Sequence, residues 1–370
     1  MGEETSFWLA FSHVPGVGSV RITRLLDAFG SLERAWHVDA QALRSAGIGP
    51  KTTQSILRVR SELNLEDALA RVHQLGVRIL TLVSADYPEP LKHIQGPPAC
   101  LFVKGGLLES DRFAVAMVGT RRASAYGKAI TEDLASELAS MGLTIISGLA
   151  RGIDAIAHQA ALSAEGRTLA VLGSGIDQIY PSEHRRLAGQ ICARGALVSE
   201  YPPGTLPEGH HFPARNRIIA GLAMGVIVIE AAERSGALIT ADFAADQGKD
   251  VFAVPGDINR KTSRGTNRLI QDGAHPLLAA VDVMEILNLR PFDVGSYEQT
   301  DMPEDEVQAV LLKLLGEAPA HIDVLYQKSG LPIHEIQAAL SMLELRGMIK
   351  PLGGMQFMRM REAGIPYHVD

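Results

Sequence analysis

The chain has few cysteines and few aromatic residues, and it contains no long apolar run. Its two cysteines, Cys100 and Cys192, lie far apart in apolar surroundings. We therefore expect neither a disulfide framework nor a cysteine metal cluster, and this usage fits a reducing cytoplasm. No stretch of about twenty apolar residues could span a bilayer, and the N-terminus lacks the basic and apolar regions of a secretion signal. The expected protein is cytoplasmic and has no membrane segment.

Positive charge is also scarce. The sequence has 35 Lys and Arg residues against 42 Asp and Glu residues, a formal net charge of −7, which argues weakly against a nucleic-acid partner. The positions of the cations matter more than their sum, because many of them follow predicted strands and would share one rim of a sheet. These residues are Arg121, Arg122, Arg151, Arg185, Arg186, Arg215, Arg217, Arg260, Lys261 and Arg264. We expect a locally positive crevice on an acidic protein.

Six apolar, β-branched runs are the clearest structural signal. They are Phe113 to Val118, Leu143 to Ile146, Thr168 to Leu172, Ala196 to Val198, Gly225 to Ile229 and Asp250 to Val254. Continuous apolar runs separated by helix-length segments predict a mostly parallel sheet with right-handed crossovers, an α/β fold. Glycine, hydroxyl and arginine residues follow the runs, at the strand ends where such sheets bind ligands.

Other segments flank this sheet. Residues 1–75 predict short helices with two Gly-apolar-Gly hairpins, Val14 to Gly18 and Ala46 to Pro50, typical of a helix-hairpin-helix (SAM-like) domain. Such turns can direct backbone N–H groups at a phosphate, but they also simply let two helices pack closely, and the two interpretations stay open. Residues 76–289 are expected to form the sheet domain, with 76–111 as a connecting segment that packs onto it.

The C-terminal part predicts a separate module. Residues 290–303 have the composition of a linker, and residues 304–370 show three helical patterns followed by a hairpin, typical of a winged helix. The presumed recognition helix, Pro332 to Arg346, carries Glu335 and Glu344 and has only Arg346 as a cation. This composition favours contact with protein over contact with DNA bases.

Several cofactor and metal motifs are incomplete. Gly173-Ser174-Gly175 follows a strand, but Gln178 stands where a dinucleotide fingerprint needs its third glycine, and no P-loop is present. Asp154 and His158, one helical turn apart, would supply only two metal ligands, and a structural pairing is favoured. His210 and His211, as neighbours on an extended segment, would point to opposite sides. We expect no cofactor and no metal.

The segment Phe212 to Gly221 carries the strongest chemical signal. Arg215, Asn216 and Arg217 stand at the entry to an apolar helix, after an aromatic residue, and forked groups of this kind suit a phosphodiester backbone and a stacked base. The alternative is that the two arginines pair with Glu200 and Glu230 across the crevice.

These motifs together resemble the DNA-processing protein A (DprA/Smf) family. The resemblance covers nearly all of Phe113 to Leu278. It is carried by Met117 to Arg121, Ser147 to Asp154 with His158, Gly173 to Asp177 with Tyr180-Pro181, Ser199 to Gly204, Phe212 to Leu222, Glu230 to Ala241 and Val254 to Gly256. One departure is His184-Arg185, where the family has an Asn-Lys pair. The resemblance implies an extended Rossmann-like domain with helical and winged-helix accessory domains.

The resemblance also implies a function. The family binds single-stranded DNA without strong sequence preference, dimerises and helps load the RecA recombinase in natural transformation, so we expect no catalytic residues. The expected DNA-binding residues are Gly119, Thr120, Arg121, Ser147, Gly148, Arg151, Gly173, Ser174, Arg185, Phe212, Arg215, Asn216, Arg217 and Arg264. The alternative is a nucleotide-binding enzyme resembling the phosphoribohydrolases, but their Pro-Gly-Gly-x-Gly-Thr loop is missing between Glu230 and Thr240.

Overall fold

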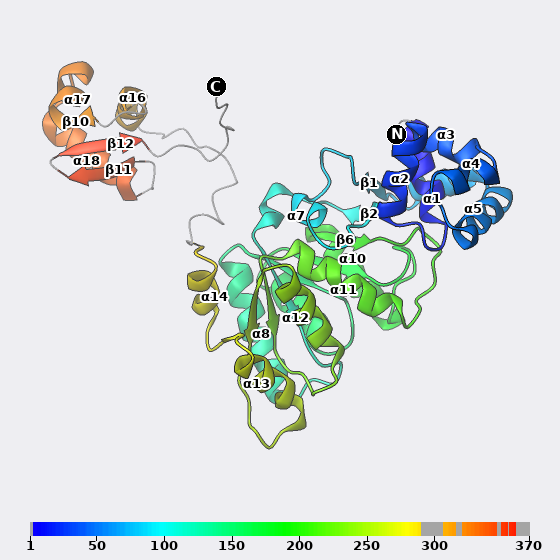
Figure 1. Cartoon of the computed structure of the whole chain (residues 1–370). Helices are drawn as coiled ribbons and strands as arrows, with labels where there is room; N and C mark the ends of the chain where they lie inside the picture. Colours follow the sequence, from blue (N-terminus) through cyan, green and yellow to red (C-terminus); the bar gives the residue numbers. More distant parts are fainter. Residues whose placement is uncertain (1–2, 290–305, 316–319, 346–348, 354, 360–370) are drawn as a thin grey trace. The chain divides into compact units, whose positions relative to one another are not determined.

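A computed structural model describes residues 3–289, 306–315, 320–345, 349–353 and 355–359. The chain divides into two compact units, Met1–Ser296 and Tyr297–Asp370 (Figure 1). The predicted linker 290–303 and Arg346 lie outside the described residues. Across the described part, no helix combines the length and the apolar character that crossing a membrane requires.

The first unit is built on a nine-stranded sheet in the order β1-β2-β6-β5-β4-β3-β7-β8-β9. Its strands are β1 (Arg78–Thr81), β2 (Cys100–Gly105), β3 (Ala114–Val118), β4 (Thr144–Ser147), β5 (Thr168–Leu172), β6 (Ala196–Ser199), β7 (Gly225–Val228), β8 (Asp250–Ala253) and β9 (His275–Pro276). All six predicted strands are present, and β3 to β9 run parallel. This confirms the predicted α/β class.

The connecting segment joins the sheet itself. β2 pairs antiparallel with β6, with Phe102 opposite Ser199, and β1 pairs antiparallel with β2. These two strands extend the parallel sheet at one edge, which is a common way to finish a doubly wound sheet. The connecting segment therefore contributes its two strands, β1 and β2, to the central layer.

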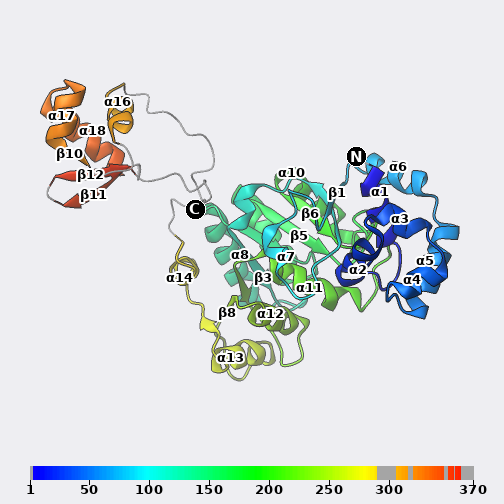
Figure 2. The same cartoon turned by 45° about the horizontal axis from the view of Figure 1, so that its top comes forward.

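Helices cover both faces of the sheet. They are α7 (Glu89–Lys92), α8 (Ala125–Ser140), α9 (Ile153–Ser163), α10 (Arg185–Arg194), α11 (His211–Leu222), α12 (Gly236–Asp246), α13 (Arg264–Gln271) and α14 (Ala280–Ile286). Successive residues of a strand face opposite sides. Val118 packs with α11 and α12 on one face, and Met117 packs with α8 and α9 on the other. Figure 2 shows α8, α11 and α12 lying against the strands of the sheet.

The N-terminal helices pack into the same unit. They are α1 (Glu3–Ser12), α2 (Ser19–Phe29), α3 (Leu32–His37), α4 (Ala40–Ser45), α5 (Pro50–Glu62) and α6 (Leu65–Gln74). The two predicted hairpins precede α2 and α5, as expected from the sequence. Trp8 and Phe11 share a buried cluster with Phe102 of β2 and Leu197 of β6, so the helical region and the sheet have one continuous core.

The second unit has the predicted winged-helix elements. They are α16 (Glu306–Leu314), β10 (Ala320–His321), α17 (Ile322–Ser329), α18 (Ile333–Leu345), β11 (Ile349–Gly353) and β12 (Gln356–Arg359). The three strands form an antiparallel sheet in the order β10-β12-β11. Its core includes Leu311, Leu325 and Leu340, one from each helix. The expected three helices and hairpin are therefore confirmed.

Candidate functional site

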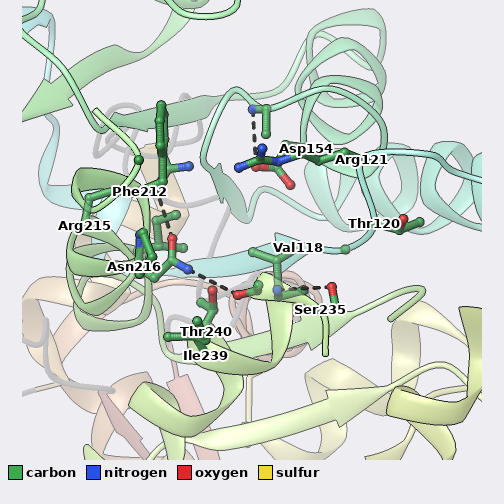
Figure 3. A pocket seen from close by; sticks show the side chains of 17 residues that line it. Val118, Thr120, Arg121, Asp154, Phe212, Arg215, Asn216, Ser235, Ile239 and Thr240 are labelled. Carbon is green, nitrogen blue, oxygen red and sulfur yellow. Dashed lines mark hydrogen bonds between the residues drawn. The ribbon is translucent and has the colours of Figure 1, made fainter. Parts of the chain in front are cut away.

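A cavity of about 310 Å³ lies beyond the carboxyl end of β3. Strand β3 stands between β4 and β7, where the strand order reverses, and this switch point is where doubly wound sheets bind ligands. The cavity is lined by Val118, Gly119, Thr120, Arg121, Ala150, Asp154, Gly209, Phe212, Pro213, Arg215, Asn216, Ile219, Ser235, Gly236, Ala237, Ile239 and Thr240. In Figure 3, Arg121 and Asp154 lie on one side of it and Ser235 and Thr240 on the other.

Arg121 and Phe212 form the rim of this cavity. Arg121 is exposed in the loop after β3, and its guanidinium carbon lies 5.8 Å from the centre of the Phe212 ring. The Phe212 ring in turn lies 5.5 Å from that of Tyr180. Arg121 forms no ion pair with any residue in the described part of the chain. The rim therefore presents a cation beside a half-buried ring, Phe212, and an exposed ring, Tyr180, the combination that binds phosphates and stacks bases.

A smaller cavity of about 30 Å³ continues the first. Both are lined by Arg121, Ala150 and Phe212, and the smaller one adds Gly148, Arg151, Tyr180 and Pro181. The Arg151 guanidinium is paired with the Glu183 carboxylate through two hydrogen bonds of 2.6 and 2.8 Å. Side chains of both residues are more than half exposed, so this pair can separate without burying a charge.

Arg215 forms the floor of the cavity. It is 4% exposed, and its Nη1 donates to the carbonyl oxygens of Gly148, at 2.8 Å, and Val171. Burial lowers the pKa of its guanidinium to about 10, and the group therefore stays charged at neutral pH. A Cβ on Gly148 would overlap the guanidinium, which explains the glycine at this strand end. Arg215 thus braces the ends of β4 and β5.

Asp154 holds the loop between β4 and α9. Its carboxylate is buried and accepts hydrogen bonds from the backbone N–H groups of Gly148, at 3.2 Å, and Ala150, at 3.3 Å. Burial raises the pKa of Asp154, while the charge of Arg215 and these N–H donors act in the opposite direction. Gly152 has φ +76°, and a Cβ there would overlap the backbone of Thr120 and Arg121, so the two loops approach closely.

His158 does not pair with Asp154, contrary to the expectation from their spacing. Its Nδ1 lies 2.6 Å from the Thr168 hydroxyl, which itself donates to the Ile145 carbonyl at 2.7 Å. The hydroxyl therefore accepts from Nδ1–H. Burial lowers the pKa of His158 to about 3, so the ring is neutral. His158 therefore has a structural contact, as predicted, but its partner is the Thr168 hydroxyl of β5 and not Asp154.

The alternative pairing of the arginines with acids holds for Arg217. Its guanidinium donates to both oxygens of the Glu200 carboxylate, at 2.9 and 2.6 Å, and also to the Gly96 carbonyl at 3.0 Å. Glu230 accepts instead from the backbone N–H and hydroxyl of Ser124, at 2.9 and 2.6 Å, and so fixes the start of α8. Arg217 lines a different cavity, beside α2.

The other predicted site residues fall into two groups. The hydroxyls of Ser147 and Ser174 are buried and donate to the carbonyls of Met117 and Gln178, at 2.6 and 2.7 Å, so the first joins β4 to β3 and the second holds the loop after β5. Arg185 and Arg264 begin α10 and α13 and line neither crevice cavity, and Arg264 lies 3.8 Å from Glu233. The structure brings together Gly119, Thr120, Arg121, Gly148, Arg151, Phe212, Arg215 and Asn216 around the two cavities.

Some lining residues were not among those predicted. Tyr180 is 45% exposed beside Phe212, and Ser235, Gly236 and Thr240 come from the start of α12. The sequence signal for these residues was their place in the motifs after β5 and β7. That their hydroxyl and aromatic groups line one cavity became clear only when the fold brought these loops together.

The prediction that His210 and His211 lie on an extended segment and point to opposite sides was wrong. His210 has helical backbone angles and His211 begins α11, so the segment is not extended at this point. Their rings lie 4.4 Å apart, on the same side of the chain.

The doubly wound sheet and the arginine at its switch point define a Rossmann-like α/β protein with a crevice at its strand ends. The family model of DNA recombination-mediator protein A matches residues 78–288, and that of the DprA winged helix domain matches residues 296–355. The chain belongs to the DNA recombination-mediator protein A family, and this confirms the resemblance seen in the sequence.

Individual relatives support this assignment. Protein Smf of Synechocystis sp. is 37% identical, with 96% of this chain and 99% of that protein aligned. The X-ray structure of DNA processing protein A (DprA) from Streptococcus pneumoniae matches with a TM-score of 0.66 at 36% identity, covering 77% of this chain and 98% of that one. A Helicobacter pylori DNA processing protein A structure, described for its single-stranded DNA binding mode, matches with a TM-score of 0.53 at 31% identity, covering 58% and 96%.

Proposed function

We propose that the crevice binds the backbone of single-stranded DNA. The observation that carries this proposal is Arg121, an exposed cation that forms no ion pair in the described structure, held over Phe212 at the edge of the cavity. A cation that faces solvent can release counterions from a phosphate chain, and an aromatic face can stack on any base. The single-stranded DNA binding described for the Helicobacter pylori relative is consistent with this proposal.

The residues around Arg121 take different roles in this proposal. Arg121, Arg151 and Phe212 contact the strand directly, and Gly119 lies in the loop that presents Arg121. The Thr120 N–H donates to the Glu230 carbonyl at 2.8 Å and its carbonyl accepts from Ile153, so Thr120 holds this loop in place. Gly148 and Gly173 lie in the neighbouring loops that follow β4 and β5. Arg215, Asn216, Ser147 and Ser174 act through the loops that they hold. Only a longer DNA strand would reach Arg185, Arg217 and Arg264. Arg217 would also have to leave its ion pair with Glu200 first.

We further propose a cellular role in recombination. The protein would act in the cytoplasm as a homodimer formed through its Rossmann-like domain, protect incoming single strands and help load the RecA recombinase during natural transformation. Membership of the DNA recombination-mediator protein A family supports this role. Sedimentation measurements test the dimer. DNA-dependent ATP hydrolysis by the recombinase, on strands coated with wild-type or Arg121→Ala protein, tests the loading.

The binding proposal is tested by replacing Arg121 with alanine. We expect oligo-dT affinity to fall by about tenfold or more, because a charge-assisted phosphate contact contributes about 1.5–3 kcal/mol. The slope of log affinity against log salt should fall by about one. Arg122→Ala is the matched control, since Arg122 is an exposed neighbour that lines neither cavity. An Arg121→Ala isotherm that superimposes on the wild-type isotherm would refute the assignment.

The same preparations address the enzyme alternative. Nucleoside monophosphates mixed with the wild-type protein should release no free base, because we propose a binding protein without catalytic residues. Release of base that depends on the protein would favour the phosphoribohydrolase interpretation.

A further inference from the structure

Three potential metal ligands meet just before and at the start of α11. Glu208, His210 and His211 each offer one ligand atom, and these atoms all lie within 4.8 Å of one another. The Glu208 Oε2 atom is 3.5 Å from His210 Nδ1. The two imidazole rings are 4.4 Å apart between centroids, with an interplanar angle of 61°. The turn into the helix, rather than an extended backbone, brings these groups to one side.

His211 adds an independent observation. Its ring packs on Tyr201, with centroids 4.1 Å apart and planes tilted by 30°. The Nδ1 atom is buried, and none of the described residues gives it a hydrogen-bond partner. A buried ring nitrogen without a partner is costly and rare in folded proteins. A bound cation beside His210 would supply the missing partner.

We propose that Glu208, His210 and His211 bind one divalent transition-metal ion, with zinc as the best match. Two imidazole nitrogens and one carboxylate oxygen form a donor set that zinc accepts, whereas calcium and magnesium prefer oxygen donors alone. Three protein ligands leave one position of a tetrahedral ion open to water or to an anion. The Glu208 carboxylate also offsets the partial positive charge at the helix N-terminus, which would otherwise oppose a cation.

The site lies next to the crevice. Gly209 lies within the metal-binding segment and Phe212 directly follows it, and both line the cavity under Arg121. The open position of the ion could therefore accept a phosphate oxygen of a strand in the crevice. This second step rests on the proposed DNA binding, whereas the metal site itself does not.

The test uses the full-length protein after chelation and dialysis, titrated with Co²⁺ and, separately, with Zn²⁺. We expect a tetrahedral cobalt absorption band that saturates at one ion per chain and that zinc displaces. His210→Ala and Glu208→Gln should each weaken binding at least tenfold. His93→Ala is the matched control, because His93 is likewise exposed and lies 3.2 Å from a glutamate, Glu89. Its binding should equal that of the wild type.

Two outcomes would overturn the site. One is a wild-type protein without a tetrahedral cobalt band, and the other is a His210→Ala isotherm equal to that of the wild type. The His210 side chain is 74% exposed, so this variant should fold, and circular dichroism checks that it does. Oligo-dT titration with and without zinc tests the contact to the strand. Zinc should raise the affinity of the wild type but not that of His210→Ala, and equal affinities would overturn that contact alone.

Discussion

The floor and the rim of the crevice use the same residue types in different ways. On the floor, Arg215 is buried and donates to carbonyl oxygens of β5 and of the loop after β4, and the Ser147 hydroxyl donates to a carbonyl of β3. On the rim, Arg121 is exposed and forms no ion pair in the described chain, although the buried Asp154 carboxylate feels its charge, and Phe212 and Tyr180 present their rings. Arg121 follows β3 and Arg215 lies on α11, and only the one on the rim has its charge available to a ligand.

This difference separates stability from binding. A buried guanidinium that satisfies several backbone acceptors stabilises the fold, and its loss leaves those acceptors unpaired. An exposed guanidinium contributes little to folding, because water solvates it equally well in the unfolded chain. We therefore expect substitutions on the floor to change the free energy of unfolding, and substitutions on the rim to change DNA affinity and its salt dependence.

Replacing Arg215 with methionine should have the largest effect. Methionine fills part of the volume but removes the guanidinium that donates to the Gly148 and Val171 carbonyls and the stronger of the two arginine charges acting on Asp154. We expect the free energy of unfolding to fall by about 3 kcal/mol, as when one partner of a buried charged network is removed. Urea denaturation measures it. A stable variant that has lost only its DNA affinity would place Arg215 on the rim.

The pH dependence of stability should show the second largest effect, through His158. Burial lowers its pKa from 6.5 to about 3 in the folded state, so below pH 6.5 the unfolded chain binds a proton that the folded chain does not. Stability is therefore lost as the pH falls from 6.5 towards 3, by up to about 1.4 kcal/mol per pH unit from this group.

His158→Gln provides the comparison for that measurement. Glutamine keeps an N–H donor for the Thr168 hydroxyl but does not titrate. Between pH 6.5 and pH 5, the wild type should lose about 1.6 kcal/mol more than the variant in denaturant titrations. Equal losses would mean that burial does not keep the His158 ring neutral in the folded protein.

The floor and the rim also differ in how far the sequence could predict them. The six apolar runs became strands because a strand buried on both faces must be apolar throughout, and this pattern is local. β1 and β2 were assigned to a connecting segment because prolines and glycines surround them, and only their pairing with β6 places them in the sheet. β9 spans two residues, too few to give a pattern.

The partners of charged residues could not be predicted from spacing. Arg215 and Arg217 are two residues apart on one helix, and one turns to backbone carbonyls while the other turns to Glu200. Asp154 and His158 have helical spacing, but nearby N–H groups bind the aspartate, and the Thr168 hydroxyl binds only the Nδ1 atom of the histidine, whose Nε2 atom is buried without a hydrogen-bond partner among the described residues. Such choices depend on loops that meet only in the folded chain. The rim position of Arg121 could be predicted, because the end of a strand at the switch point is fixed by topology.

A smaller effect should come from Glu183, which pairs with Arg151 on the rim. Its pKa is lowered by the hydrogen bonds from Arg151, so it is ionised at neutral pH and competes with a phosphate for that guanidinium. Glu183→Gln should raise oligo-dT affinity about two- to threefold at low salt, and less at high salt. Glu165→Gln, which disrupts the exposed Glu165–Arg194 pair, is the control and should change nothing. A Glu183→Gln affinity at or below that of the wild type would show that Arg151 does not contact the strand.

Removing the second unit should have the smallest effect. A chain that ends at Leu289 keeps the whole sheet and both crevice cavities, and the winged-helix unit has a separate core. The exposed first turn of α18 carries Glu335, which would repel phosphates. We expect the oligo-dT affinity of the truncated chain to stay within about twofold of the full chain, with Arg121→Ala weakening both equally. A large loss on truncation would instead make the winged helix the main DNA-binding element, and the rim of the crevice a secondary contact.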